Sequence, residues 1–126
     1  MCAGSLGANP KNDVPSIARR FADKIHFAHL RNVRKDADGS FEEAAHLTGD
    51  TDMVELVSVL LQEEKRRRAA GVEPWEIPFR PDHGHDLLDD ASRNTHPGYP
   101  LIGRLRGLAE LRGVIAGLSR PGISTV

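Results

Sequence analysis

The sequence has little cysteine, few aromatic residues and no excess of either charge. A single cysteine in 126 residues excludes an internal disulfide framework and fits a reducing compartment. The 17 basic and 18 acidic side chains give a net charge of -1, which offers no electrostatic basis for binding nucleic acid or an acidic membrane surface. No apolar run approaches the roughly 18 residues that a membrane span needs, and no secretory segment follows Met1. We therefore expect a soluble, cytoplasmic protein that binds neither nucleic acid nor membrane.

The one basic cluster of the chain is the run 65–68, which directly follows two glutamates. Glu63 lies four residues before Arg67, and Glu64 lies four residues before Arg68. This spacing places opposite charges on one face of a helix. It favours a solvated helix end laced with ion pairs over a nucleic-acid patch.

The spacing of apolar residues predicts three helices that alternate with two short strands. We expect helices at residues 13–22, 51–70 and 101–118, and strands at residues 24–30 and 75–80. On the last helix, the apolar side is expected to hold Ile102, Leu105, Leu108, Ala109, Leu111, Ile115 and Leu118. Alternation of helices and strands is typical of parallel βα units.

The segments between these elements are rich in glycine and polar residues. Residues 3–12 read as a loop, and residues 31–50 as a long polar connection in which 41–47 form a helical turn or a short strand. One or two helical turns are expected at 85–91, and a frayed tail at 119–126.

The densest group of polar residues follows the second predicted strand. Asp82, His83 and His85 surround Gly84, whose backbone can turn sharply. Carboxylate and imidazole groups bind borderline divalent metals and also transfer protons. A polar turn with surface histidines explains the same residues, so this motif by itself leaves both interpretations open.

Topology gives a reason for several polar residues to meet. His29 and Arg31 lie at the carboxyl end of one predicted strand, and Asp82 lies just past the next. Cys2 occupies the equivalent place before the first loop and helix. The carboxyl ends of parallel strands point to one face, where ligand sites form. Taken singly, Cys2 has no assigned role, His29 fits a core histidine and Asp82 a turn cap; together they favour a metal or catalytic site.

Five blocks of the sequence resemble the mannonate dehydratase family, the bacterial enzymes of hexuronate (glucuronate) breakdown. The blocks occur in order over nearly the whole chain: Cys2-Ala3-Gly4-Ser5-Leu6-Gly7-Ala8, His26-Phe27-Ala28-His29-Leu30-Arg31, Phe41-Glu42-Glu43-Ala44-Ala45-His46-Leu47 with Gly49-Asp50, Arg80-Pro81-Asp82-His83-Gly84-His85, and Asn94-Thr95-His96-Pro97-Gly98-Tyr99 with Ile102-Gly103-Arg104-Leu105. Five ordered blocks are far more specific than any one of them.

The resemblance implies a (β/α)8 barrel of the xylose-isomerase-like kind that uses Mn2+ or Fe2+. It implies a lyase that dehydrates D-mannonate to 2-dehydro-3-deoxy-D-gluconate. By motif, Cys2, His29 and Asp82 match metal ligands, and His83 and Tyr99 match catalytic residues. The resemblance leaves open which of these two is the base and which the acid.

Three further residues are candidates for binding the substrate. Arg31 or Arg80 can hold the substrate carboxylate by a forked contact, although either can instead form a structural ion pair. His85 lies beside the catalytic candidate in the same motif.

A complete barrel needs about 250 residues, twice the present length. We therefore expect residues 1–126 to be the carboxyl-terminal part of one barrel domain. The family's other histidine ligand lies on an earlier strand. The expected partners are a missing amino-terminal barrel segment and, in the completed enzyme, further copies of the chain. The alternatives are a non-catalytic remnant or interaction fragment, or a metal-dependent sugar isomerase of the same fold.

Overall fold

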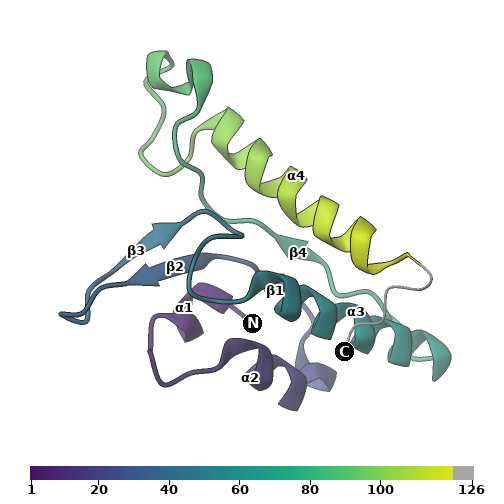
Figure 1. The fold of residues 1–126 in the computed structure, drawn as a ribbon. Coiled ribbons are helices and arrows are strands. Elements are labelled where there is room, and N and C mark those ends of the chain that lie inside the picture. Colours follow the sequence, from purple (N-terminus) through teal and green to yellow (C-terminus); the bar gives the residue numbers. More distant parts are fainter. Residues whose placement is uncertain (121–126) are drawn as a thin grey trace.

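The computed structural model describes residues 1–120, which form a mixed arrangement of helices and short strands (Figure 1). Parallel pairing and helices occur together, as the sequence predicts for an α/β fold. The elements in chain order are α1 (Ala3–Gly7), α2 (Val14–Arg20), the 3₁₀ turn η1 (Ala22–Lys24), β1 (Ala28–His29), β2 (Asn32–Lys35), β3 (Phe41–Ala44), α3 (Met53–Ala69), β4 (Phe79–Arg80), the 3₁₀ turn η2 (Leu88–Ser92) and α4 (Leu101–Leu118).

The two predicted strands pair side by side and in parallel. Ala28 of β1 lies opposite Phe79 of β4, and His29 lies opposite Arg80. Cys2 forms a parallel bridge with His29 on the other side of β1. The ordered pairing is much shorter than the predicted strands, with two residues in each, but the parallel neighbours are confirmed. Residues 1–2, β1 and β4 therefore lie in a row with their carboxyl ends together.

The core is an apolar cluster gathered around α3. Its buried members come from both ends of the chain and include Ala3, Val14, Ala18, Ile25, Ala28, Leu30, Met53, Leu56, Val57, Val59, Leu60, Ile77 and Leu111. Helices α2 and α4 both contact α3, so α3 lies between the two other long helices. This packing fixes the strand row, since Ala28 and Leu30 flank His29 and are themselves buried.

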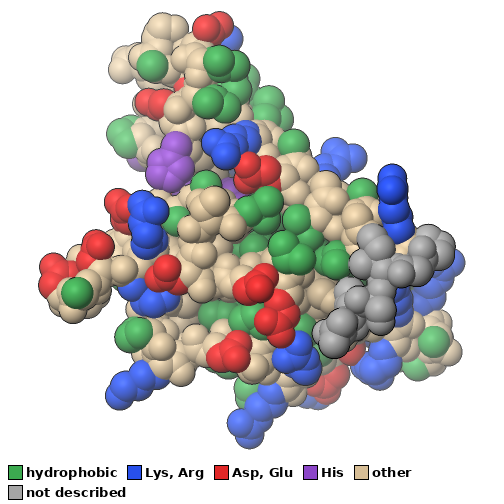
Figure 2. Space-filling model, viewed as in Figure 1, with side chains coloured by type: hydrophobic (Ala, Val, Ile, Leu, Met, Phe, Trp, Pro, Cys, Tyr) green, Lys and Arg blue, Asp and Glu red, His purple; other side chains and the backbone are tan. Residues whose placement is uncertain are grey.

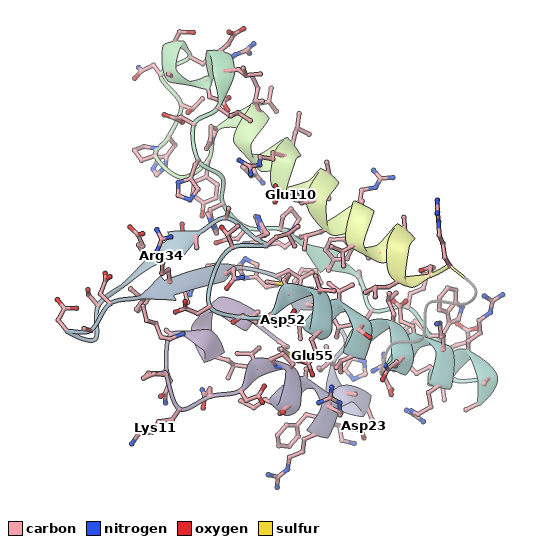
Figure 3. The ribbon with its side chains drawn as sticks, viewed as in Figure 1. Lys11, Asp23, Arg34, Asp52, Glu55 and Glu110 are labelled. Carbon is pink, nitrogen blue, oxygen red and sulfur yellow. The ribbon has the colours of Figure 1, made fainter. Side chains whose placement is uncertain are left out.

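Side-chain caps explain where the helices begin. The Asp13 carboxylate accepts a hydrogen bond from Ser16 N at 3.1 Å at the start of α2. The Asp52 carboxylate accepts a hydrogen bond from Glu55 N at 2.9 Å at the start of α3 (Figure 3). Each cap satisfies a backbone donor that has no partner within its helix.

Helix α4 has the bounds that the sequence predicts, but it packs through its glycines. Gly103, Gly107 and Leu111 are its buried residues, and they are spaced four apart on one face. The prediction of an apolar inner side is wrong for Leu105, which is 54% exposed, and for Ala109, which is also exposed. The glycine face allows backbone to approach backbone, since a Cβ on Gly103 would lie 2.0 Å from His85 O.

Two predicted loops contain regular structure. Residues 3–7, expected to be loop, form α1, with the Cys2 side chain accepting from Ser5 N at its start. Most of the expected connection 31–50 is an antiparallel hairpin of β2 and β3, in which Val33 lies opposite Glu43. The short strand at 41–44 was one of the two alternatives for that segment. The expected turns at 85–91 occur as η2, and residues 121–126 of the predicted tail lie outside the described residues.

The predicted solvated helix end is wrong for one of its two pairs. Glu63 and Arg67 are 5% and 3% exposed, and Arg67 Nε donates to Glu63 Oε1 at 2.8 Å. Arg67 also donates to the carbonyl oxygens of Ala22 at 2.9 Å and Ile25 at 2.8 Å. The spacing predicted the pair, but the chain between α2 and β1 covers it. The arginine therefore anchors the segment that leads into β1.

Within residues 1–120, no helix combines the length and apolar character needed to cross a membrane.

Candidate metal centre

The carboxyl ends of three chain segments meet at one place. His29 N donates to Met1 O at 2.8 Å, and Leu30 N donates to Arg80 O at 3.0 Å. These ladder bonds place Cys2, His29 and the residue after β4 side by side, as the topological argument predicts. Asp82 follows β4 by two residues and is 5% exposed. The backbone alone therefore brings the three predicted ligand positions together.

The Asp82 carboxylate lies between two imidazole rings. Its Oδ1 is 2.8 Å from His29 Nε2, and its Oδ2 is 3.8 Å from His83 Nδ1. Burial raises the pKa of the Asp82 carboxyl, but the close contact with the His29 imidazole, together with the charges of His29, His83 and Arg31, outweighs burial and leaves this pKa below its usual value. Asp82 is therefore ionised at neutral pH, the form that binds a cation.

A backbone carbonyl fixes which nitrogen of His83 carries hydrogen. His83 Nε2 lies 2.6 Å from Ala44 O, and a carbonyl oxygen can only accept, so Nε2 is the donor. In the neutral ring Nδ1 is then a bare lone pair. It lies 3.8 Å from Asp82 and 3.9 Å from Glu43 Oε2, and the ring is 1% exposed.

Two buried imidazole nitrogens in this cluster lack a hydrogen-bond partner among residues 1–120. They are His83 Nδ1 and His29 Nε2. His29 Nε2 is close to the Asp82 oxygen but is not aligned to donate to it. Buried polar atoms without partners are uncommon in proteins and call for a ligand or water. Two free imidazole nitrogens beside a carboxylate are a donor set that can hold a divalent metal ion.

The thiol of Cys2 belongs to this edge but is turned toward its own helix. Its Sγ accepts from Ser5 N at 3.4 Å and from Ser5 Oγ at 3.2 Å. Burial raises the pKa of the Cys2 thiol. The hydrogen bonds from Ser5 and the charge of Arg31 together lower it by more, so the pKa lies below its ordinary value. A lowered pKa favours the thiolate, which is the metal-binding form.

Within the described chain, three side chains form a set whose ligand atoms all lie within 4.8 Å of one another: Glu43, Asp82 and His83. The predicted trio of Cys2, His29 and Asp82 is thus adjacent in the backbone without being this tightest cluster. His29 nevertheless contacts Asp82 from the opposite side.

The predicted substrate-binding residues lie around this cluster in different settings. Arg31 Nη1 is 3.7 Å from Glu43 Oε1, and Arg80 Nη2 is 3.3 Å from Asp82 Oδ1. The Arg31 side chain passes closely over α1, where a Cβ on Gly4 would lie 2.1 Å from its Nε. Both arginines therefore make the ion pairs that the sequence left as their alternative role.

A cavity of about 400 Å³ opens beside His83 and reaches the 95–98 turn. It is lined by Glu43, His83, Gly84, His85, Asp86, Thr95, Pro97 and Gly98. Figure 2 shows histidine side chains at the surface between the segment that contains η2, at the top of the view, and the β2–β3 hairpin. The His85 ring meets His83 edge-on, with centroids 5.8 Å apart. Both histidines of the motif therefore line one opening.

Tyr99 lies on the rim rather than within this lining. It is 47% exposed, its ring lies 5.8 Å from that of His96, and the Arg104 guanidinium lies 5.6 Å from its centroid. The turn before it is tied to the motif, because Gly84 N donates to Gly98 O at 2.9 Å. This bond brings Tyr99, the predicted catalytic tyrosine, close in the backbone to Gly84, which follows His83. Within residues 1–120, no hydrogen bond or ring contact joins the Tyr99 and His83 side chains.

Sequence reasoning assigned no role to two residues of this cluster, Glu43 and His46. Glu43 reaches His83 from β3, and the buried His46 ring stacks on the His83 ring with centroids 5.2 Å apart. Burial, followed by the charge of His83, lowers the pKa of His46 to about 4, so it is neutral at neutral pH. The signal was the Asp38-Gly39 turn, which marks a hairpin that carries both residues to the strand ends.

Comparison with known proteins places these residues in one family. Residues 1–123 match the family model described as D-mannonate dehydratase (UxuA). The chain is 58% identical over 122 residues to a mannonate dehydratase of Rhizobium meliloti, covering 94% of this chain and 30% of that protein. It is 57% identical over 130 residues to mannonate dehydratase 1 of Agrobacterium fabrum, covering 99% and 32% respectively. A Saccharophagus degradans mannonate dehydratase is 56% identical over 119 residues, covering 94% and 30%.

Proposed function

The chain belongs to the D-mannonate dehydratase family, and we propose that it carries the metal-binding and proton-transfer groups of a hydro-lyase that converts D-mannonate to 2-dehydro-3-deoxy-D-gluconate. The chain spans about 30% of the length of the curated relatives it matches. The observation that carries the proposal is the buried Asp82 carboxylate with an unpartnered imidazole nitrogen on each side. Buried imidazole nitrogens without a partner call for a ligand or water at this position.

In the proposed site, Cys2, His29 and Asp82 hold Mn2+ or Fe2+. Imidazole and carboxylate suit both ions, and the lowered pKa of the Cys2 thiol favours its thiolate form. A divalent ion bound there would stabilise the negative charge that develops on substrate oxygens during dehydration. Glu43 lies within reach of Asp82 and His83 and is a further anionic group at the same position.

We assign the base to His83. Dehydration removes the C2 proton and the C3 hydroxyl, and the electron pair of the C2–H bond becomes the C2–C3 double bond. Because Nε2 of His83 is bound to Ala44 O, Nδ1 presents the free lone pair that accepts the C2 proton. Tyr99 carries the phenol proton that the departing hydroxyl takes up to leave as water. The enol that remains tautomerises to the 2-keto product.

The substrate is proposed to enter through the cavity beside His83. The volume of about 400 Å³ is within the range of small-molecule sites, and its lining is polar at His85 and Asp86. Arg80 is the better candidate for the substrate carboxylate, since its side chain is 59% exposed, whereas Arg31 is held against α1 and Glu43. The partner is thus an acidic sugar.

We propose that the parallel row of residues 1–2, β1 and β4 is part of a (β/α)8 barrel. Three features support this assignment: parallel neighbours, helices after each strand segment, and polar groups at the carboxyl ends. The remaining wall, including a further histidine ligand, has to come from outside these 126 residues. For that reason the chain on its own should bind metal weakly and turn over no substrate.

Manganese binding tests the proposal. Isothermal titration of the chain with Mn2+ should show one site, and Asp82→Asn should weaken it by more than the roughly 10- to 100-fold that loss of an outer-shell group causes. Asp23→Asn is the matched control, because Asp23 is exposed and pairs only with Lys24 among the contacts recorded. Unchanged affinity in Asp82→Asn would remove Asp82 from the ligand set and with it the proposed site.

A further inference from the structure

We propose that His46 is a positioning residue that holds the Asp82–His83 pair in its working geometry, with Gly107 of α4 providing the space for its ring. The proposal rests on the function proposed for Asp82 and His83. His46 is 2% exposed and lies in the loop after β3. Burying a polar ring costs stability unless the ring is hydrogen-bonded, so its position calls for an explanation.

His46 contacts both members of the pair. Its Nε2 accepts a hydrogen bond from Asp82 N at 3.4 Å, which holds the backbone from which the carboxylate projects. Its ring stacks on the His83 ring, with centroids 5.2 Å apart and planes 15° apart. The stack keeps the His83 ring in the plane in which Nε2 reaches Ala44 O. One side chain thus restrains both groups.

The backbone of His46 is itself clamped. Asn32 Nδ2 donates to His46 O at 2.8 Å and to Thr51 O at 2.9 Å, and Asn32 Oδ1 accepts from Thr51 N at 3.1 Å. Asn32 is fully buried, with an exposure of 0%. The buried amide therefore ties the loop after β3 to the start of α3, and His46 is held at its base.

The other edge of the ring faces α4. A Cβ built on Gly107 would lie 2.5 Å from His46 Nδ1 and 2.6 Å from its Cε1, closer than any real side-chain contact. His83 covers one face of the ring, which restricts how far the ring can move away. Helix α4 also carries the Arg106–Glu110 ion pair at the rim of this narrow space, and Glu110 is labelled in Figure 3. A residue without a side chain is therefore needed at position 107 to make room for the His46 ring, and not to form the helix.

This arrangement separates two contributions of His46: an acceptor for Asp82 N and a flat surface for His83. Glutamine places an amide oxygen near the position of Nε2 but has no ring, and phenylalanine keeps a ring but has no acceptor. His46→Gln and His46→Phe therefore remove one contribution each. Gly107→Ala leaves His46 in place and displaces its ring from outside. His26→Gln is the matched control, since His26 is exposed and lies outside the cluster.

Amide hydrogen exchange at Asp82 in the metal-free chain tests the acceptor. We expect roughly tenfold faster exchange in His46→Phe, a rate close to wild type in His46→Gln, and no change in His26→Gln. Gly107→Ala should also accelerate exchange at Asp82, which supplies the answer if a His46 variant fails to fold. Equal protection of Asp82 in wild type, His46→Phe and Gly107→Ala would overturn the proposal.

Mn2+ titration of the same variants measures the consequence. His46→Phe and Gly107→Ala should weaken Mn2+ binding about 10- to 100-fold, the usual effect of losing an outer-shell partner, with His26→Gln unchanged. If the wild-type chain binds no Mn2+, the proposed metal site fails, and the exchange rates at Asp82 still decide whether His46 positions the pair. If Mn2+ binds equally to all variants while exchange at Asp82 changes, His46 does not position the metal ligands and the proposal is wrong.

Discussion

Replacing Glu63 by glutamine should destabilise the fold strongly, because it removes the counter-charge from a buried arginine. Glu63 accepts from Arg67 Nε at 2.8 Å and from Arg66 Nε and Nη2 at 2.7 Å each. Breaking one partner of a buried pair typically costs about 3–5 kcal/mol. We expect a loss near the lower end, about 3 kcal/mol, since Arg67 keeps its two carbonyl acceptors, Ala22 O and Ile25 O.

The effect should depend on pH in a direction that follows from the pKa of Glu63. The hydrogen bond from Arg66, together with that from Arg67 and both charges, lowers this pKa from 4.5 to about 2. Because the pKa is lower in the folded chain than in the unfolded chain, the contribution to stability is complete above pH 4.5 and is lost as the pH falls toward 2. The difference between wild type and Glu63→Gln should therefore narrow over that window.

Urea unfolding followed by circular dichroism, near neutral pH and again at about pH 3, measures both parts of this prediction. Glu55→Gln is the matched control on the same helix. Glu55 pairs with Arg19 at 2.9 Å, but the two side chains are 48% and 54% exposed, and a surface pair contributes about 1 kcal/mol or less. The reasoning is refuted if Glu63→Gln costs no more than Glu55→Gln, or if its cost stays the same at the lower pH.

Three further predictions concern the strand ends, the loop after β3 and helix α4. Ser5→Ala should raise the pKa of the Cys2 thiol, since it removes the side-chain hydrogen bond that lowers it, and alkylation rates of Cys2 measured against pH should shift to higher pH. Gly49→Ala should cost about 1–3 kcal/mol in thermal unfolding, because its Cβ would lie 2.4 Å from the fully buried Asn32 amide. Gly113→Ala, with nothing within 4 Å, should leave stability unchanged or slightly raise it.

Local patterns in the sequence were sufficient for helices α2, α3 and α4 and for the row of strand ends, but not for α1, which was expected to be a loop. Helix α4 runs from Leu101 to Leu118 as predicted, because a proline-rich turn precedes it and its apolar spacing is continuous. Parallel pairing of the segments around His29 and Arg80 followed from helix–strand alternation, which leaves few topologies. The predicted ligand positions are adjacent for the same reason.

The rest depends on contacts between residues distant in sequence. Strand β2 is too polar to be recognised by alternation, so the hairpin that carries Glu43 and His46 to Asp82 was missed. The four-residue spacing of Glu63 and Arg67 predicts their ion pair but cannot show that the chain before β1 covers it. Similarly, the apolar pattern of α4 does not reveal that its glycines face the core, because that choice is made by the close approach of His46 and His85.

The most direct test of the proposed function is a chimera. In it, this chain replaces the matched segment of the Rhizobium meliloti relative, to which it is 58% identical. Formation of 2-dehydro-3-deoxy-D-gluconate from D-mannonate is then measured with Mn2+ present. We predict turnover by the chimera, none by the 126-residue chain alone, and none by the chimera carrying His83→Gln. Undiminished turnover by the His83→Gln chimera would contradict the assignment of His83 as the base, and an inactive but folded chimera would contradict the proposed function.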